Sequence, residues 1–172
     1  MNVKDEEYSE NVEMYLKVIH LLEVKTGEPA QTNEIAEVLE IAPPSVTEML
    51  YQLHSDGLVT HERYKGAAMT PQGKKIAKKI LLKHHLIEKF ITDTLGVRDK
   101  NLAHEQACKM EHVLDDNLVM RLKKVVKIKD YKLSDDDVEM ELCSRFLHPK
   151  KIKRKPRKKR SRKKKRKRSQ RR

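Results

Sequence analysis

The segment from His104 to His112 carries four side chains of the kinds that bind transition metals. A helix advances about 100° per residue, so all four fall within one face about 100° wide: His104, Cys108, Glu111 and His112. Two imidazoles, a thiol and a carboxylate suit first-row transition metals, and the sulfur favours a softer ion over Mg²⁺ or Ca²⁺. The alternative is a polar helix face with two histidines beside a buried cysteine. Four such side chains on one face favour the metal site.

Two other segments carry ligand-type side chains. His84 and Glu88 are spaced to share one face of a helix, where with His104 they could clasp an ion. The alternative for this pair is a hydrogen bond along the helix. Met14 faces away from the main apolar side of its predicted helix and could reach a second lobe, the alternative being a flexible core filler. Three further residues have no other ligand-type side chains at ligand spacing and are expected to be structural or on the surface: His85, Cys143 and His148.

The N-terminal part of the chain predicts a helix-turn-helix. A first helix over residues 10–25 is apolar on two sides, which is typical of a helix wedged between two other elements. A short helix over residues 32–39, with Thr32 placed to cap it, precedes a turn. Pro44 suits the first position of the next helix, over residues 45–54. Two short helices joined by a tight turn are the arrangement of DNA-binding helix-turn-helix proteins.

A hairpin and further helices follow. Strands over residues 58–64 and 67–70, turning about Lys65 and Gly66, predict a β-hairpin wing. Helices are then expected over residues 71–94, from about 101, from 115 and over 134–142. The helix from residue 115 carries apolar residues spaced like a dimer or packing face: Leu118, Leu122 and Val125.

The charge divides the chain into two unlike parts. The whole sequence has a net charge of +13, yet residues 150–172 hold 18 of the 39 Lys and Arg residues and no acid, which leaves a net charge of −5 elsewhere. We expect this polybasic tail to be disordered and to contact nucleic acid, the alternatives being a solubilising tail, an RNA-binding tail or a targeting signal. An acidic N-terminus and no run of 18 apolar residues predict a soluble, cytoplasmic protein with no membrane segment.

These motifs resemble the diphtheria toxin repressor family of metal-dependent transcriptional repressors, over roughly residues 11–126. The most specific matches are Glu13-Met-Tyr-Leu16, Lys83-His84 with Glu88, and the segment from His104 to His112. The resemblance implies a mainly α protein with a winged helix-turn-helix domain, a helical metal-binding and dimerisation domain, and the tail, over residues 1–72, 73–148 and 149–172. We expect no room for the SH3-like third domain that full-length members often carry.

The resemblance also implies two metal sites. A primary site would use Met14, Cys108, Glu111 and His112, and an ancillary site His84, Glu88 and His104. The manganese-type branch has carboxylates where this chain has Met14, Lys17 and Cys108, so resemblance and ligand softness both favour Fe²⁺. Mn²⁺, Ni²⁺, Co²⁺ and Zn²⁺ are the alternatives.

The predicted reading helix has no basic residue, and residues 1–70 hold 13 acidic but only five basic residues. We expect DNA contacts from the helix-turn-helix residues Thr32, Pro44, Ser45, Thr47, Glu48 and Gln52, of which the polar side chains of the second helix would read base edges. Arg63 and Lys65 in the wing would contact phosphates, with Lys74 and Lys75 beside them. The tail could supply the remaining non-specific affinity.

Together these features predict a homodimeric repressor that binds double-stranded DNA at a palindromic operator when loaded with a divalent metal. One alternative is a metal-independent winged-helix protein that binds nucleic acid. The other is a metal-dependent enzyme, against which stand the absence of an H-E-x-x-H motif, a nucleophile elbow and a glycine-rich phosphate loop.

Overall fold

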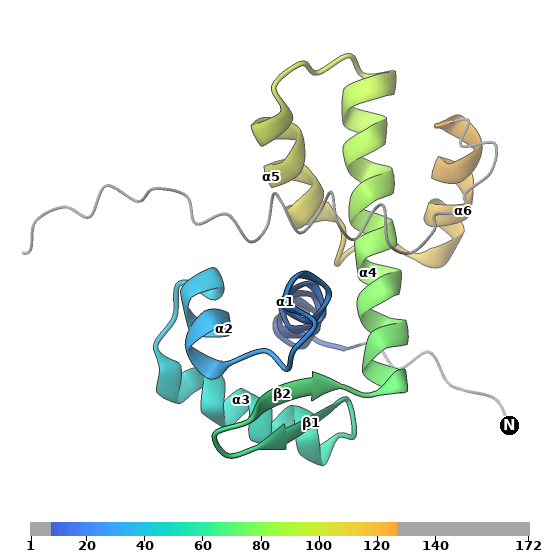
Figure 1. The fold of residues 1–172 in the computed structure, drawn as a ribbon. Helices are drawn as coiled ribbons and strands as arrows, with labels where there is room; N and C mark the ends of the chain where they lie inside the picture. The colour runs from blue at the N-terminus through green and yellow to red at the C-terminus, as the bar shows by residue number, and fades with distance from the viewer. Residues whose placement is uncertain (1–7, 127–172) are drawn as a thin grey trace, which may run out of the picture.

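The computed structural model describes residues 8–126, and the expected helix over residues 134–142, the polybasic tail, Cys143 and His148 lie outside this range. Its elements follow the chain in the order α1 (Glu10–Thr26), α2 (Thr32–Leu39), α3 (Pro43–Ser55), β1 (Val59–Glu62), β2 (Gly66–Met69), α4 (Pro71–Lys89), the π-helical turn η1 (Phe90–Thr94), α5 (Lys100–Met110) and α6 (Asp116–Val125). Helices α2 and α3 and the hairpin form one lobe, α5 and α6 flank the upper part of α4, and α1 lies between these groups (Figure 1). None of the described helices is long and apolar enough to cross a membrane.

Helix α1 is wedged in the centre of the molecule, as its two apolar sides predict. The Ser9 side chain accepts a hydrogen bond from the amide of Val12, and Gly27 ends the helix in the left-handed conformation with φ 73°. Its buried residues run from Val12 to Leu22 on more than one side, and it packs on α2, β2 and α4. The same helix therefore contributes to the core of the DNA-binding lobe and reaches the helices beyond it.

The helix-turn-helix is confirmed, with α2 over the expected residues, but the cap of α2 and the first residue of α3 differ from the expectation. Ala30 pairs with Ala67 in a short bridge, with both backbone hydrogen bonds at 2.9 Å, so the chain stays extended through Gln31. Gln31 is consequently the N-cap of α2, and Thr32 is its first helical residue rather than its cap. Helix α3 begins at Pro43, so prolines fill its first two positions, where no amide donor is needed.

The wing is a two-stranded antiparallel hairpin with Val59 opposite Met69 and Glu62 opposite Gly66. Its turn is longer than the sequence suggests, because Tyr64 adopts a left-handed conformation with φ 68°. Gly66 starts β2 with φ 89°, and a Cβ at this position would lie 2.6 Å from the carbonyl oxygen of Ala30. The bridge to Ala30 therefore requires glycine here.

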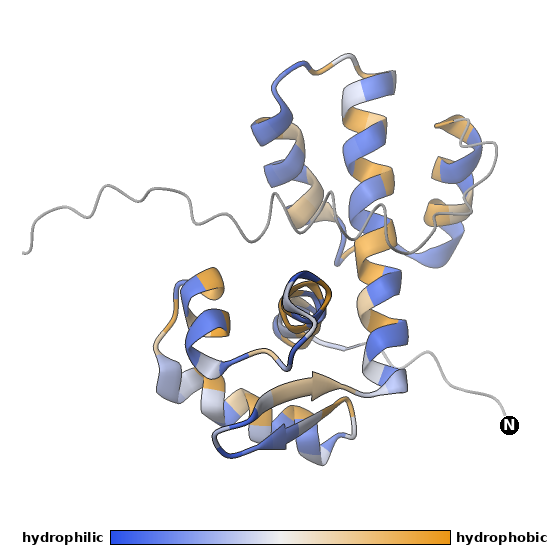
Figure 2. Cartoon of the chain, in the orientation of Figure 1, coloured by the Kyte–Doolittle hydropathy of each residue, from blue (hydrophilic) through white to orange (hydrophobic). Residues whose placement is uncertain are grey.

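Helix α4 connects the two lobes. Thr70 caps it by accepting from the amide of Gly73, whose own Cβ would lie 2.1 Å from the carbonyl oxygen of Leu58. Its first half, with Ala77 and Leu81, belongs to the core under α1 to β2. Its second half, with Leu86 and Ile87, belongs to a smaller core completed by residues that follow α4: Ile91, Ala103, Ala107, Leu114 and Val119. Hydrophobic and hydrophilic residues accordingly alternate along the whole helix (Figure 2).

The expectation that one helix carries all four residues between 104 and 112 is wrong for the last two. Helix α5 ends at Met110, Glu111 is its C-cap, and His112 lies in the following turn. Asp115 already caps α6 by accepting from the amide of Leu118 at 2.7 Å, so the chain must reverse within the few residues between. The direction of the His112 side chain is therefore set by this turn and not by the spacing along α5.

Candidate metal centre and DNA-reading surface

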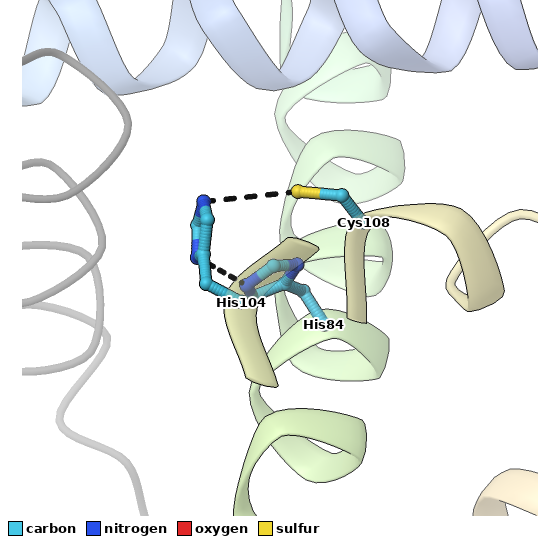
Figure 3. A group of neighbouring side chains, drawn as sticks. All are labelled: His84, His104 and Cys108. Atoms are coloured by element: carbon cyan, nitrogen blue, oxygen red, sulfur yellow. Dashed lines mark hydrogen bonds between the residues drawn. The ribbon is translucent and has the colours of Figure 1, made fainter. Parts of the chain in front are cut away.

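Three ligand-type side chains meet where α5 packs on α4 (Figure 3). His84 is buried on α4, and His104 and Cys108 lie one turn apart on α5. Nε2 of His84 is 3.2 Å from Nδ1 of His104, and Nε2 of His104 is 3.7 Å from Sγ of Cys108. Nitrogen and sulfur donors, one from each residue, all lie within 4.8 Å of one another. An ion with bonds of about 2.0–2.3 Å joins donors that are at most about 4.6 Å apart, so these donors need to approach one another only slightly to bind it.

Glu88 adds a carboxylate to this group. Its Oε2 lies 3.3 Å from Nε2 of His84 and 3.7 Å from Nδ1 of His104. The three residues expected to form an ancillary site are thus brought together. Cys108, which the resemblance assigns to the other site, lies with them instead of apart from them. The two expected ligand sets are neighbours, because the ring of His84 contacts both Glu88 and Glu111.

Glu111 sits beneath this group and orients His84. Its Oε2 lies 2.6 Å from Nδ1 of His84, and both side chains are fully buried. When the ring is neutral, Nδ1 donates this hydrogen bond, and Nε2 carries the lone pair that faces His104. A carboxylate that fixes the tautomer of a histidine in this way is the usual support of a metal-binding imidazole.

Helix α1 reaches the same residues through two charged pairs. The Lys17 ammonium forms a salt bridge with Oε1 of Glu111, and both side chains are fully buried. One turn earlier, Oε2 of Glu13 lies 2.6 Å from Nδ1 of His112. Nε2 of His112 is in turn 3.2 Å from Oε1 of Glu111. The helix wedged into the DNA-binding lobe is therefore tied to the ligand-bearing turn by ionic contacts.

The pairing shifts the protonation of these groups. Burial alone would raise the pKa of the Cys108 thiol, but hydrogen bonds with His104 and His84 and the charge of Lys17 lower it to about 6. Burial would also raise the pKa of Glu111, yet its contacts with His112 and His84 and the charge of Lys17 hold it at about 2. The same contacts keep the cationic forms of the histidines: burial opposes this, but Glu111 and Glu13 raise the pKa of His112 to about 9. The pKa of His84 is likewise raised despite its burial, through Cys108 and Glu111.

The donor set fits a divalent transition metal. Imidazole nitrogens that can coordinate once they lose a proton, a thiol with a pKa of about 6 and ionised carboxylates lie within one compact region. Nε2 of His112 is buried and has no hydrogen-bond partner among the described residues, although Glu111 lies beside it. When its ring is neutral, this nitrogen and the carboxylate oxygen are two acceptors face to face, an arrangement that a cation between them would stabilise.

The sequence reasoning missed Glu13 and Lys17. Both are charged, are spaced to share one face of α1, and flank Met14, which is half-buried on that helix. Charged residues at helical spacing in a helix that is otherwise apolar all round were a usable signal, because a buried charge needs a partner. The structure adds them to the candidate centre, where contacts link every expected ligand except Met14.

The DNA-reading surface is built differently. Four of the expected contact residues are exposed on α3: Pro44, Ser45, Glu48 and Gln52. Thr47 is half-buried and donates from Oγ1 to the Pro43 carbonyl at 3.1 Å, while Thr32 is half-buried at the start of α2. Glu48 has no counter-ion within the described part of the chain. An unpaired exposed carboxylate on this helix needs a hydrogen-bond donor from the partner it meets.

The wing turn presents basic and aromatic side chains together. The guanidinium carbon of Arg63 lies 5.1 Å from the ring centroid of Tyr64, and Lys65 forms an exposed ion pair within the hairpin. Tyr64 is 87% exposed and Tyr51 on α3 is 58% exposed, with its ring edge-on to His61 at 5.3 Å. These two tyrosines were not expected at this surface, and their exposure is the only signal that would have found them.

Comparison with known proteins agrees with this geometry. Residues 7–67 match the family model described as "Iron dependent repressor, N-terminal DNA binding domain", and residues 70–131 match "Iron dependent repressor, metal binding and dimerisation domain". An uncharacterized HTH-type transcriptional regulator of Methanocaldococcus jannaschii is 43% identical over 67% of this chain and 91% of its own length. The diphtheria toxin repressor of Corynebacterium diphtheriae is 38% identical over 69% of this chain, which spans only 51% of that protein.

Among solved structures, the manganese regulator SloR is similar with a TM-score of 0.59 and 33% identity, over 69% of this chain and 54% of SloR. The matched regions contain both the reading surface and the candidate metal centre. The family comprises metal-dependent transcriptional repressors, so the alternative of an enzyme is wrong. The chain belongs to the iron-dependent repressor family, as a mainly α protein with an N-terminal winged helix-turn-helix and a helical metal-binding and dimerisation domain.

Proposed function

We propose that the protein is an Fe²⁺-responsive repressor that binds a palindromic operator as a homodimer. The observation that carries the choice of metal is the group of His84, His104 and Cys108 with donor atoms within 4.8 Å. Two imidazoles and a thiol poised to ionise suit Fe²⁺ better than Mn²⁺, which prefers oxygen donors. The matching family model is described as iron dependent, whereas one similar solved structure is titled a manganese regulator, so Fe²⁺ and Mn²⁺ are both to be tested.

The seven proposed ligands divide into two sets. His84, Glu88 and His104 would hold one ion, and Met14, Cys108, Glu111 and His112 a second. A bound ion would supply a divalent charge that crosslinks its ligands. Because Met14 lies on α1 and the other primary ligands follow α4, the ligands would fix how the DNA-binding lobe sits on the rest of the molecule.

Homodimerisation would then set the spacing between two reading helices on one face of the duplex. Leu118 and Val125 share one side of α6 and are exposed, which supports a dimer face there, whereas Leu122 is partly buried against the core. Helix α3 would enter the major groove, and Arg63 and Lys65 of the wing would contact phosphates. The contact of the polybasic tail with nucleic acid, and a cytoplasmic location beside the chromosome, stay predictions.

The test is the affinity for duplex DNA from immediately upstream of the protein's own coding region. Fluorescence anisotropy is measured anaerobically with Fe²⁺, with Mn²⁺, Co²⁺ and Zn²⁺ in turn, and with a chelator. We expect tight binding with Fe²⁺ that the chelator abolishes and that a scrambled duplex does not reproduce. Binding that is equal with metal and with chelator would support the metal-independent alternative.

A further inference from the structure

The Lys17–Glu111 salt bridge puts a cation of the protein itself inside the candidate metal centre. Lys17 and Glu111 are both fully buried, although they lie 94 residues apart in the sequence. A lysine is almost never buried without a partner, so this contact is what allows Lys17 to sit in α1 at this point. The ammonium faces a carboxylate that is itself a proposed ligand.

Both carboxylate oxygens of Glu111 already contact a cation or an imidazole nitrogen. Oε1 faces the Lys17 ammonium and Nε2 of His112, and Oε2 faces Nδ1 of His84. A metal ion that bonds to Oε1 must share this oxygen with the Lys17 ammonium, so the two cations compete for the same carboxylate. Oε2 already orients His84 towards His104, so removing Lys17 would leave that arrangement of ligands in place.

The remaining groups around this point differ in how they would respond. Glu13 is bonded to His112, and Glu88 lies on the far side of His84 among the nitrogen and sulfur donors. An ion bound mainly by the nitrogen and sulfur donors loses little affinity when Lys17 occupies Glu111. An ion that depends on carboxylate oxygens loses more affinity, and it is also repelled by the positive charge of Lys17 at short range.

We propose that Lys17 is a metal-selectivity residue: its ammonium competes with divalent ions for Glu111 and so disfavours hard, oxygen-seeking ions relative to softer ones. This inference rests on the proposed metal site, but it concerns a residue that is not one of the proposed ligands. Lys17 acts by occupying a ligand, and not by binding the metal.

The experiment compares dissociation constants for Mn²⁺ and Co²⁺ by isothermal titration calorimetry on the full chain. Lys17→Met removes the charge while keeping much of the side-chain volume, and Lys17→Arg keeps the charge. We expect Lys17→Met to tighten Mn²⁺ binding about tenfold and Co²⁺ binding less than about threefold, since a hydrogen bond to a charged group is worth more than one such factor. Lys17→Arg should keep the wild-type ratio of the two constants.

Lys25→Met is the matched control, because it makes the same charge change at an exposed position two turns along α1. An unchanged Mn²⁺-to-Co²⁺ ratio in Lys17→Met, or weaker Mn²⁺ binding, would overturn the inference. If circular dichroism shows that Lys17→Met does not fold, Lys17→Gln retains a donor for Glu111 without the charge, and the same ratio decides. Wild-type protein that binds neither metal contradicts the proposed function, whereas wild-type binding with an unchanged variant ratio contradicts only the role of Lys17.

Discussion

The candidate metal centre and the DNA-reading surface use polar side chains in opposite ways. In the metal centre the charged groups are buried and paired with one another across α1, α4 and α5, as Lys17 is with Glu111. On α3 the polar groups are exposed, and Glu48 has no counter-ion within the described residues. The buried, paired charges can respond to a small cation, whereas the exposed polar groups of α3 can contact only an external partner such as DNA.

Helix α1 joins these two regions. Its apolar residues complete the core below the reading helix, and its Glu13 and Lys17 hold the turn that carries the proposed ligands. We therefore expect a change in the partners of that turn to alter the position of the DNA-binding lobe without any direct contact between ion and DNA. We call the buried metal centre the sensor and the exposed surface of α3 the reader, and substitutions in each should change different measured quantities.

The largest expected effect is on stability, from Glu111→Gln. This variant leaves the Lys17 ammonium buried without its carboxylate, so we expect the free energy of unfolding in chelator to fall by about 3–5 kcal/mol. The measurement is urea denaturation followed by circular dichroism.

Asp116→Asn is the control for this loss. It makes the same chemical change in a lysine–carboxylate pair, with Lys79 at 2.7 Å, but both partners are half exposed. We expect a loss of about 0–1 kcal/mol there. Equal losses in the two variants would show that the buried pair has no special role.

The next effect is on metal binding. Cys108→Ser replaces the thiolate with a hydroxyl that does not ionise, so we expect Co²⁺ affinity to fall about a hundredfold, as for loss of a soft ligand. The near-ultraviolet thiolate-to-cobalt charge-transfer band should also disappear in this variant. A wild-type spectrum in the variant would exclude Cys108 as a ligand and leave it as a core residue.

Much of both regions could be predicted from the sequence, because each element carries its own signal. Helical spacing identified His84 with Glu88, and turn residues identified the wing around Gly66. The salt bridge of Lys17 could not be predicted, because the periodicity of a helix shows which face a residue is on but not what lies opposite 94 residues away. The direction of His112 was missed for another reason: the helix ends two residues earlier, at a boundary that helical spacing does not mark.

Metal affinity should also depend on pH. A histidine must be neutral to coordinate, and the pKa of His112 is raised to about 9, so below that value metal binding must first release its proton. We therefore expect Co²⁺ affinity to rise about tenfold per pH unit between about 7 and 9 and then to level off. Calorimetry in two buffers of different ionisation enthalpy counts the protons released. A flat profile would show that His112 is not a ligand.

The smallest effect concerns the reading surface alone. A carboxylate accepts a hydrogen bond from N4 of cytosine, whereas an amide pairs better with adenine, so Glu48→Gln should shift the preferred base at one operator position by about fivefold or more. Selection of bound duplexes from a randomised pool measures the shift. Glu37→Gln, with the same charge change at an exposed position on α2, should leave the selected sequence unchanged. Co²⁺ affinity should not change in either variant.

Thermodynamic coupling between the buried metal centre and the DNA-reading surface of α3 can be tested directly. The dissociation constant for Co²⁺ is measured by titration with and without saturating operator duplex. Because coupling between two sites is reciprocal, DNA should tighten metal binding by the same factor by which metal tightens DNA binding, and we expect about tenfold or more. A Co²⁺ affinity that is the same with and without operator would contradict the claim that the buried centre controls the reading helix.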